Sequence, residues 1–95
     1  MKRIMVVEDS FSTKNAGVII SGVNPEFDFL DSAEIKRLIG TKIKVVIAEG
    51  FELDVDVKEI AISESLVGKK NISIAMGAME GIDHVKRGSW VYAIE

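Results

Sequence analysis

The chain has 95 residues, with 12 lysines and arginines against 15 aspartates and glutamates, one histidine and no cysteine. This length predicts one domain over residues 1–95 with a modest hydrophobic core, and the absence of cysteine excludes disulfide bonds. The formal charge of −3 excludes a strongly basic nucleic-acid surface but is compatible with a local basic patch.

The N-terminal segment does not have the pattern of a secretion signal. The apolar stretch that follows Lys2 and Arg3 is ended by Glu8 and Asp9 before it reaches the length of a signal-peptide core. Other apolar runs stop after a few residues, whereas a membrane-spanning helix needs about 20. We therefore expect a cytoplasmic protein with no membrane partner.

The first elements in chain order are a short strand and a helix. Residues 18–20 are β-branched and lie between glycines, which predicts a strand. Asp31 and Glu34 have the spacing of a capping box and predict a helix over residues 32–39. Gly40 follows where a helix end favours a residue that tolerates positive φ.

A hairpin is predicted over residues 41–58, where apolar side chains alternate with charged ones. Apolar residues are odd-numbered in both strands, so the tightest loop that keeps them on one face pairs Ile47 with Phe51. The same register places two pairs of opposite charges face to face on the wet side, namely Lys44 with Asp54 and Lys42 with Asp56.

Two further strands are predicted over residues 72–76 and 90–94. Trp90 and Tyr92 share one face of the second of these strands, where they either belong to the core or a barrel end, or offer a surface to a base or a partner. Several short strands at this spacing predict a small barrel or sandwich.

No constellation of residues favours catalysis. Glu52, Asp54 and Asp56 gather carboxylates, but alternate residues of a strand lie about 7 Å apart on an open surface, without the apolar cleft that raises a carboxyl pKa. His84 is the only imidazole, and no serine lies in a GxSxG turn. We therefore expect a protein that is not an enzyme, with no catalytic residue, metal site or cofactor.

The Gly68-Lys69 pair lacks the other residues of a phosphate-binding loop, so we expect no nucleotide to bind. A charged turn between strands is the simpler interpretation of this segment. The alternative is a contact with RNA phosphates, provided that two basic turns meet in space. The candidate residues for this RNA or partner contact are Lys69, Lys70, Lys86 and Arg87.

Three pieces of sequence have a recognisable order: residues 7–11 with the glycine-flanked stretch 17–23, residues 56–60 with 66–68, and residues 85–91. In this order they resemble the second domain of translational GTPases, the elongation factor Tu domain 2 family of small β-barrels. The resemblance assigns residues 7–11 to an opening strand, 17–23 to the second strand, 56–60 to a middle strand and 66–68 to the turn before the next strand. The resemblance implies an all-β fold, a small antiparallel Greek-key barrel of about six strands, here with one short helix near residues 32–39. In that family the barrel supports the GTPase, contacts ribosomal RNA and, in some members, holds the 3′ end of aminoacylated tRNA.

The chain departs from this family in two ways. Asn24 to Gly40 forms a longer, acidic and helical insertion, and none of the GTPase motifs occurs. The leading hypothesis is therefore a stand-alone, non-catalytic binding module for a protein or ribonucleoprotein partner, with weak RNA contact. The alternative is a structural or regulatory protein–protein interaction domain unrelated to translation. The acidic insertion favours a basic partner surface, and the basic turns favour RNA.

Overall fold

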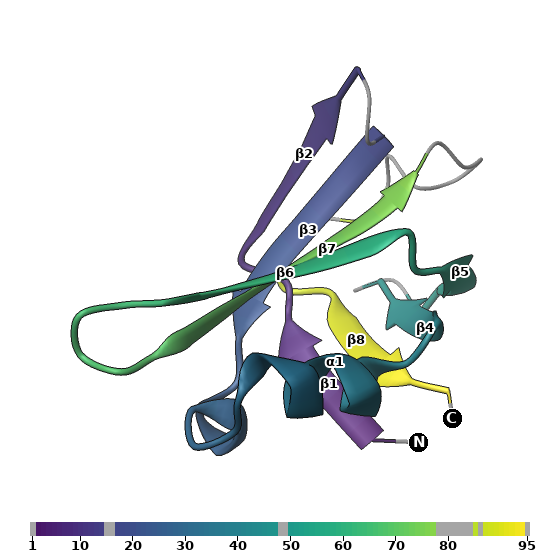
Figure 1. Ribbon diagram of the computed structural model, residues 1–95. Helices are drawn as coiled ribbons and strands as arrows, with labels where there is room; N and C mark the ends of the chain where they lie inside the picture. The colour runs from purple at the N-terminus through teal and green to yellow at the C-terminus, as the bar shows by residue number, and fades with distance from the viewer. Residues whose placement is uncertain (1, 15–16, 48–49, 78–84, 86, 95) are drawn as a thin grey trace.

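The computed structural model describes residues 2–14, 17–47, 50–77, 85 and 87–94, which form two four-stranded antiparallel sheets and one α-helix (Figure 1). The first sheet has the order β1 (Lys2–Val6), β8 (Trp90–Ala93), β4 (Lys42–Val46) and β5 (Glu52–Asp56). The second sheet has the order β2 (Asp9–Thr13), β3 (Gly17–Val23), β7 (Lys70–Gly77) and β6 (Glu59–Glu64). A 3-10 turn, η1 (Pro25–Phe27), and the helix α1 (Ser32–Ile39) follow β3. The prediction of a mostly β, antiparallel protein with one short helix is confirmed for these residues.

The first corner between the sheets joins β1 to β2 through two residues. The Val7 N–H donates to the carbonyl oxygen of Ser89, beside β8, at 2.8 Å, and the Glu8 N–H donates to the carbonyl of Ser21 in β3, also at 2.8 Å. The chain thus changes its partner sheet between consecutive residues. The stretch 7–11, expected as one opening strand, is therefore divided by this bend.

The second corner joins β5 to β6 in the same manner. The Val57 N–H donates to the Thr41 carbonyl at 2.9 Å, beside β4, and the Lys58 N–H donates to the Ala75 carbonyl of β7 at 2.8 Å. Residues 56–60, expected within one strand, are divided here too. At both corners an outer strand of one sheet continues as an outer strand of the other.

Gly22 is the residue that allows β1 to bend over β3. A Cβ atom at this position would overlap the carbonyl oxygen of Val6 and lie 3.1 Å from the sulfur of Met5. Because the obstruction is a backbone atom, the position requires a residue without a side chain. The glycine that bounds the predicted strand therefore serves the packing of two strands rather than a turn.

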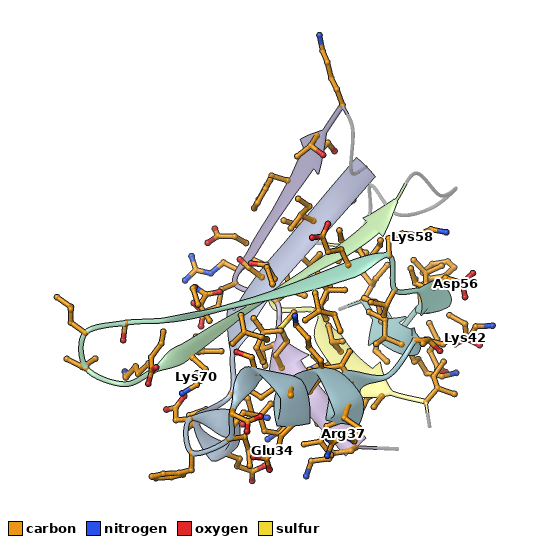
Figure 2. The ribbon with its side chains drawn as sticks, in the orientation of Figure 1. Glu34, Arg37, Lys42, Asp56, Lys58 and Lys70 are labelled. Carbon is orange, nitrogen blue, oxygen red and sulfur yellow. The ribbon has the colours of Figure 1, made fainter. Side chains whose placement is uncertain are left out.

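The β4–β5 hairpin has the register predicted from the parity of its apolar residues. The Ile47 N–H donates to the Phe51 carbonyl at 2.8 Å, and Gly50 has a φ of 88° at the end of the turn. Two pairs of charged residues face each other across the strands and form ion pairs, namely Lys44–Asp54 at 3.3 Å and Lys42–Asp56 at 3.7 Å. Figure 2 labels Lys42 and Asp56 on this hairpin.

Helix α1 begins and ends where its sequence predicts. The Glu34 N–H donates to a carboxylate oxygen of Asp31 at 2.8 Å, and Gly40, with a φ of 75°, follows the last turn. Ile35 and Ile39 are buried, and the helix packs against β8. The opposite side of the helix is polar and faces away from the sheets, as the Glu34 side chain does in Figure 2. The helix therefore contributes to the core with one face and presents charged side chains of both signs with the other, Glu34 in its first turn and Lys36 and Arg37 in its last.

The hydrophobic core lies between the inner faces of the two sheets and is closed on one side by η1 and α1. Its fully buried members from the strands include Ile4, Ile20, Ile43, Ile72, Ile74, Val45, Val55 and Val91. Alternate residues of β3, β4 and β8 point inward, as expected for sheets with one wet face, whereas no residue of β2 is buried.

Candidate functional site

The turn between β6 and β7 projects from the body of the protein at the end of a long hairpin (Figure 1). Two backbone hydrogen bonds fix it: Ser65 N–H to Lys69 O at 2.9 Å, and Gly68 N–H to Ser65 O at 3.0 Å. The Lys69 N–H also donates to the Ser65 hydroxyl at 3.1 Å. Gly68 has a φ of 83°, which any other residue would adopt only with strain. The turn is therefore held in one conformation that displays its two central side chains.

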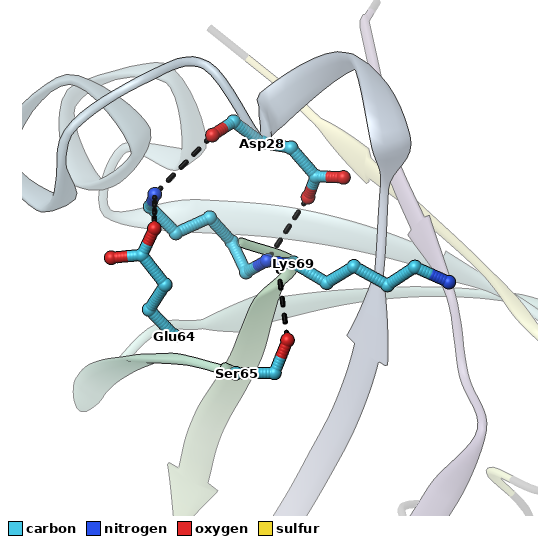
Figure 3. Close-up of polar contacts among 5 residues, drawn as sticks. Asp28, Glu64, Ser65 and Lys69 are labelled. Atoms are coloured by element: carbon cyan, nitrogen blue, oxygen red, sulfur yellow. Dashed lines mark hydrogen bonds and ion pairs between the residues drawn. The ribbon is translucent and has the colours of Figure 1, made fainter. Parts of the chain in front are cut away.

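Lys70 fastens this hairpin to the acidic insertion (Figure 3). Its backbone N–H donates to a carboxylate oxygen of Asp28 at 3.0 Å, and its ammonium group donates to the Asp28 carbonyl at 3.3 Å. The same ammonium group forms an ion pair with Glu64 at 3.1 Å, and only 12% of the side chain is exposed. Lys70 thus neutralises groups of its own protein, which leaves it a poor ligand for an external phosphate.

The other three predicted basic residues lie in different surroundings. Lys69 is exposed, and its side chain extends away from the cluster of Asp28 and Glu64 (Figure 3). Arg87 is exposed in the turn before β8, where the neighbouring Gly88 N–H donates to the Val7 carbonyl at 2.8 Å. Lys86, like His84, lies outside the described residues. The two basic turns therefore contact different parts of the chain, the insertion in one case and the first corner in the other.

The sequence analysis missed an exposed apolar group at the β6–β7 turn. Leu66 is fully exposed and Val67 is 79% exposed. Phe29, the residue after Asp28, is 92% exposed. Single exposed apolar side chains are common, but three of them on two segments joined by the Lys70 contacts suggest a binding surface. We call Phe29, Leu66, Val67 and Lys69 the tip surface.

The only sequence signal for this surface was an apolar pair within a turn. Leu66 and Val67 stand between Ser65 and Gly68, where polar residues are usual. The resemblance assigned them to the turn before the next strand and gave no expectation for their exposure. Phe29 carried no signal, because phenylalanine is more often buried than exposed.

The surroundings of the tip surface are acidic on the side of the insertion. Glu26 and Asp31 are exposed on either side of Phe29 in the sequence, and the Glu64 carboxylate is partly exposed beside Lys70. Since Lys70 is internally paired, Lys69 is the exposed lysine of this turn. The tip surface thus combines exposed apolar side chains of the turn and of the insertion with exposed acidic groups beside them.

Trp90 and Tyr92 lie on the outer face of the first sheet, so the core interpretation of this pair is wrong. Val91 and Ala93, the alternate residues of β8, are the buried ones. Trp90 remains partly exposed, and the guanidinium carbon of Arg3 lies 4.7 Å from the centre of its ring. A base that stacked on this ring would have to displace a cation–π contact.

The charged face of the β4–β5 hairpin is internally compensated. A hydrogen bond to Asp54 and the charges of Asp54 and Glu52 raise the pKa of Lys44 above its usual value of 10.5. Glu52, Asp54 and Asp56 each lie within ion-pair distance of a lysine. This face offers neither free cations for phosphate nor a pair of carboxylates in an apolar cleft.

Among the described residues, no group of three or more histidine, aspartate or glutamate side chains is arranged to hold a metal ion. In the same part of the chain, no helix is long and apolar enough to cross a membrane. Comparison with known proteins gives no match to a family model, to a curated protein or to a solved structure. The function must therefore be argued from the geometry of this chain alone.

Proposed function

We propose that the chain is a stand-alone, non-catalytic binding module with a small Greek-key β-barrel like the second domain of translational GTPases, and that it binds a protein through the tip surface. The barrel is supported by the two corners. If β1 with β2 and β5 with β6 are each counted as one bent strand, the two sheets form a ring of six strand paths. Gly22, at the close approach of β1 to β3, is the kind of residue that a tight barrel needs.

The exposure of Leu66, Val67 and Phe29 is the observation that carries the binding function. Large apolar side chains that stand in solvent gain most when a partner removes them from water, and aromatic residues are frequent among the residues that dominate binding. The fixed turn reduces the entropy that binding costs. The contacts of Lys70 with Asp28 hold the insertion and the turn together, so both segments are positioned before a partner arrives.

The expected partner is a protein with an apolar pocket bordered by basic residues. Glu26, Asp31 and Glu64 place negative charge beside the tip surface, and complementary charge would orient the partner. A translation component and a regulatory partner unrelated to translation would both bind through this surface. Sedimentation of the chain with ribosomes separates them.

RNA is the second candidate, because Lys69 and Arg87 are exposed cations on turns. The internal pairing of Lys70 removes one of the charges on which this hypothesis depended. With about three phosphate contacts or fewer, the slope of log K against log salt would be no steeper than about −3. RNA would therefore bind weakly and in a salt-sensitive manner, in addition to a protein partner.

The test compares the wild-type chain with the double variant Leu66→Ser and Val67→Ser. Each protein is immobilised, exposed to extract from the native cell, and the partner that wild type captures is purified and titrated by calorimetry. Phe51→Ser is the matched control, because Phe51 is 70% exposed at a different turn. We expect the tip variant to lose at least about tenfold in affinity, as removal of central apolar contacts usually does, and the control to bind as wild type does.

Two results would contradict the proposal. A purified partner that binds the tip variant and wild type equally would show that another surface is used. Binding to structured RNA that survives in the tip variant but is lost when Lys69 and Arg87 are changed to alanine would favour the RNA hypothesis instead.

A further inference from the structure

Strand β2 has an outer edge that no other strand covers in the described part of the chain. It pairs only with β3, and Figure 1 shows it at the margin of the molecule. Asp9, Ser10, Phe11 and Ser12 are all exposed, with half of the Phe11 side chain accessible to solvent. Backbone groups that do not face β3 are therefore available to another strand.

The other outer strands are protected against pairing with a copy of themselves. A symmetric antiparallel pairing of β5 would place Asp54 against Asp54 of the second copy, and one of β6 would place Glu59 against Glu64. Like charges directly opposite each other destabilise such pairs. Strand β1 is approached on its outer side by β3 at Gly22. Among the outer strands that the structure describes, only β2 carries no such obstacle.

The sequence of β2 is complementary to itself in one antiparallel register. When Phe11 lies opposite Phe11 of the second copy, Ser10 lies opposite Ser12 and Asp9 opposite Thr13. One residue beyond each end, Glu8 then lies opposite Lys14, and this pairing of opposite charges occurs twice by symmetry. We propose that two copies of the chain associate through β2 in this register, so that their second sheets become one continuous sheet.

Phe11 is placed to contribute to this interface. It pairs with Ile19 of β3 and lies with it on the outer face of the second sheet, because Val18 and Ile20 point into the core. A two-fold axis perpendicular to the sheet keeps both Phe11 side chains on the same face. Aromatic residues that are directly opposite across antiparallel strands stabilise the pair.

Other registers lose these contacts. A shift of one residue would place Phe11 on the face opposite to Phe11 of the second copy. A shift that centres the pair on Ser10 places Asp9 opposite Phe11 and Glu8 opposite Ser12, and one centred on Ser12 places Lys14 opposite Ser10. Only the register centred on Phe11 joins the aromatic pair and both pairs of opposite charges.

The dimer is expected to be weak. A contact between two five-residue strands is about 17 Å long and covers much less than the roughly 1,600 Å² of a standard interface. We therefore expect a dissociation constant on the order of 100 µM. Since exposed charges are screened by salt, association should weaken as ionic strength rises.

The experiment is sedimentation equilibrium of the full chain at low ionic strength with two charge reversals, Glu8→Lys and Lys14→Glu. In a dimer of either variant alone, positions 8 and 14 carry charges of the same sign and face each other at both ends of the strand pair. We expect the dissociation constant of the dimer to rise about tenfold. An equimolar mixture of the two variants opposes a lysine to a glutamate at both ends and should form a heterodimer about as tight as the wild-type dimer. The matched controls Glu34→Lys and Lys36→Glu reverse exposed charges on α1, away from β2, and should leave association unchanged.

Three results would overturn the proposal: a wild-type chain that remains monomeric up to about 1 mM, a dimer that neither charge reversal weakens, or a mixture of the variants that fails to restore association. Phe11→Lys provides an independent check, because it places two lysines together at the axis and should abolish the dimer. If the double variant Leu66→Ser and Val67→Ser lost the dimer while the β2 variants kept it, self-association would be assigned to the tip surface. Partner binding through the tip surface should persist in both β2 charge variants, so the two proposals can fail separately.

Discussion

Replacement of Gly22 by alanine tests whether the close approach of β1 and β3 stabilises the fold. Gly22 is buried, and its φ is not positive, so the backbone conformation itself accepts alanine. The added methyl group would overlap the carbonyl oxygen of Val6. Since a backbone atom cannot rotate away as a flexible side chain does, β1 must move and weaken its contacts at the corner.

The expected cost is at the upper end of the range for overpacking a core, about 3 kcal/mol in the free energy of unfolding. For a domain of this size each kcal/mol lowers the melting temperature by about 4 to 8 °C, so Gly22→Ala should melt at least about 12 °C below wild type. Gly50→Ala is the control. Its φ of 88° creates backbone strain, but no atom lies within 4 Å of the added methyl group, so we expect a loss of about 1 kcal/mol.

Urea denaturation followed by fluorescence measures both variants. Trp90, the single tryptophan, pairs with Val6 at the same corner and reports its opening directly. A Gly22→Ala variant within about 1 kcal/mol of wild type, or more stable than Gly50→Ala, would refute the argument. It would mean that β1 can retreat from β3 without cost, and the barrel interpretation would lose its main structural support.

Three further predictions concern the charged groups. Because the pKa of Lys44 is raised in the folded state, its pairing with Asp54 stabilises the fold below pH 10.5 and is lost as the pH rises through the folded-state pKa. The stability of wild type, measured by urea denaturation from pH 9 to 12, should therefore fall more steeply than that of Lys44→Gln, and parallel curves would contradict this. Lys70→Met should cost about 1 to 2 kcal/mol by removing the contacts with Asp28 and Glu64. By the same measurement Lys69→Met should lie within about 0.5 kcal/mol of wild type, and equal losses would show that the Lys70 contacts contribute nothing. Asp31→Ala removes the acceptor for the Glu34 N–H and should cost about 1 kcal/mol in thermal unfolding, whereas an unchanged melting temperature would mean that the cap is dispensable.

Local rules were sufficient for the elements whose partners are near in the sequence. The parity of apolar residues fixed the pairing of Ile47 with Phe51, because a shift of one residue would expose the apolar face of the hairpin. The Asp31 cap and Gly40 marked the helix to the residue. In both cases the signal and the structure it determines lie within about ten residues of each other.

The corners could not be predicted in this way. The resemblance predicts one strand over residues 7–11, and nothing in Val7 or Glu8 indicates that their hydrogen bonds go to Ser89 and Ser21. The bend depends on where β3 and β8 lie, which is a property of the whole fold. The sequence marked Gly22 as a strand boundary, but only the structure shows how closely the position approaches the carbonyl oxygen of Val6.

The prediction of the candidate site was limited in the same way, because it depends on contacts between residues that are far apart in the sequence. Lys69 and Lys70 are adjacent and chemically identical, so the sequence could only group them as one basic turn. Their roles differ because Lys70 meets Asp28, which is 42 residues away. The exposure of Leu66 and Val67 likewise depends on how far the hairpin extends beyond the body of the protein.

The positions of the two proposed surfaces within one sheet have a consequence for binding. The second sheet has the order β2-β3-β7-β6, so β2 and the β6–β7 hairpin form its opposite sides. A dimer joined through β2 would place the two tip surfaces at the outer ends of the continuous sheet, where neither obstructs the other. Each dimer would therefore present two identical sites, and a partner repeated on a surface would be held by both at once. Such two-site attachment strengthens binding without any new contact, so a weak dimer and a modest tip surface together would suffice for firm attachment to a repetitive partner.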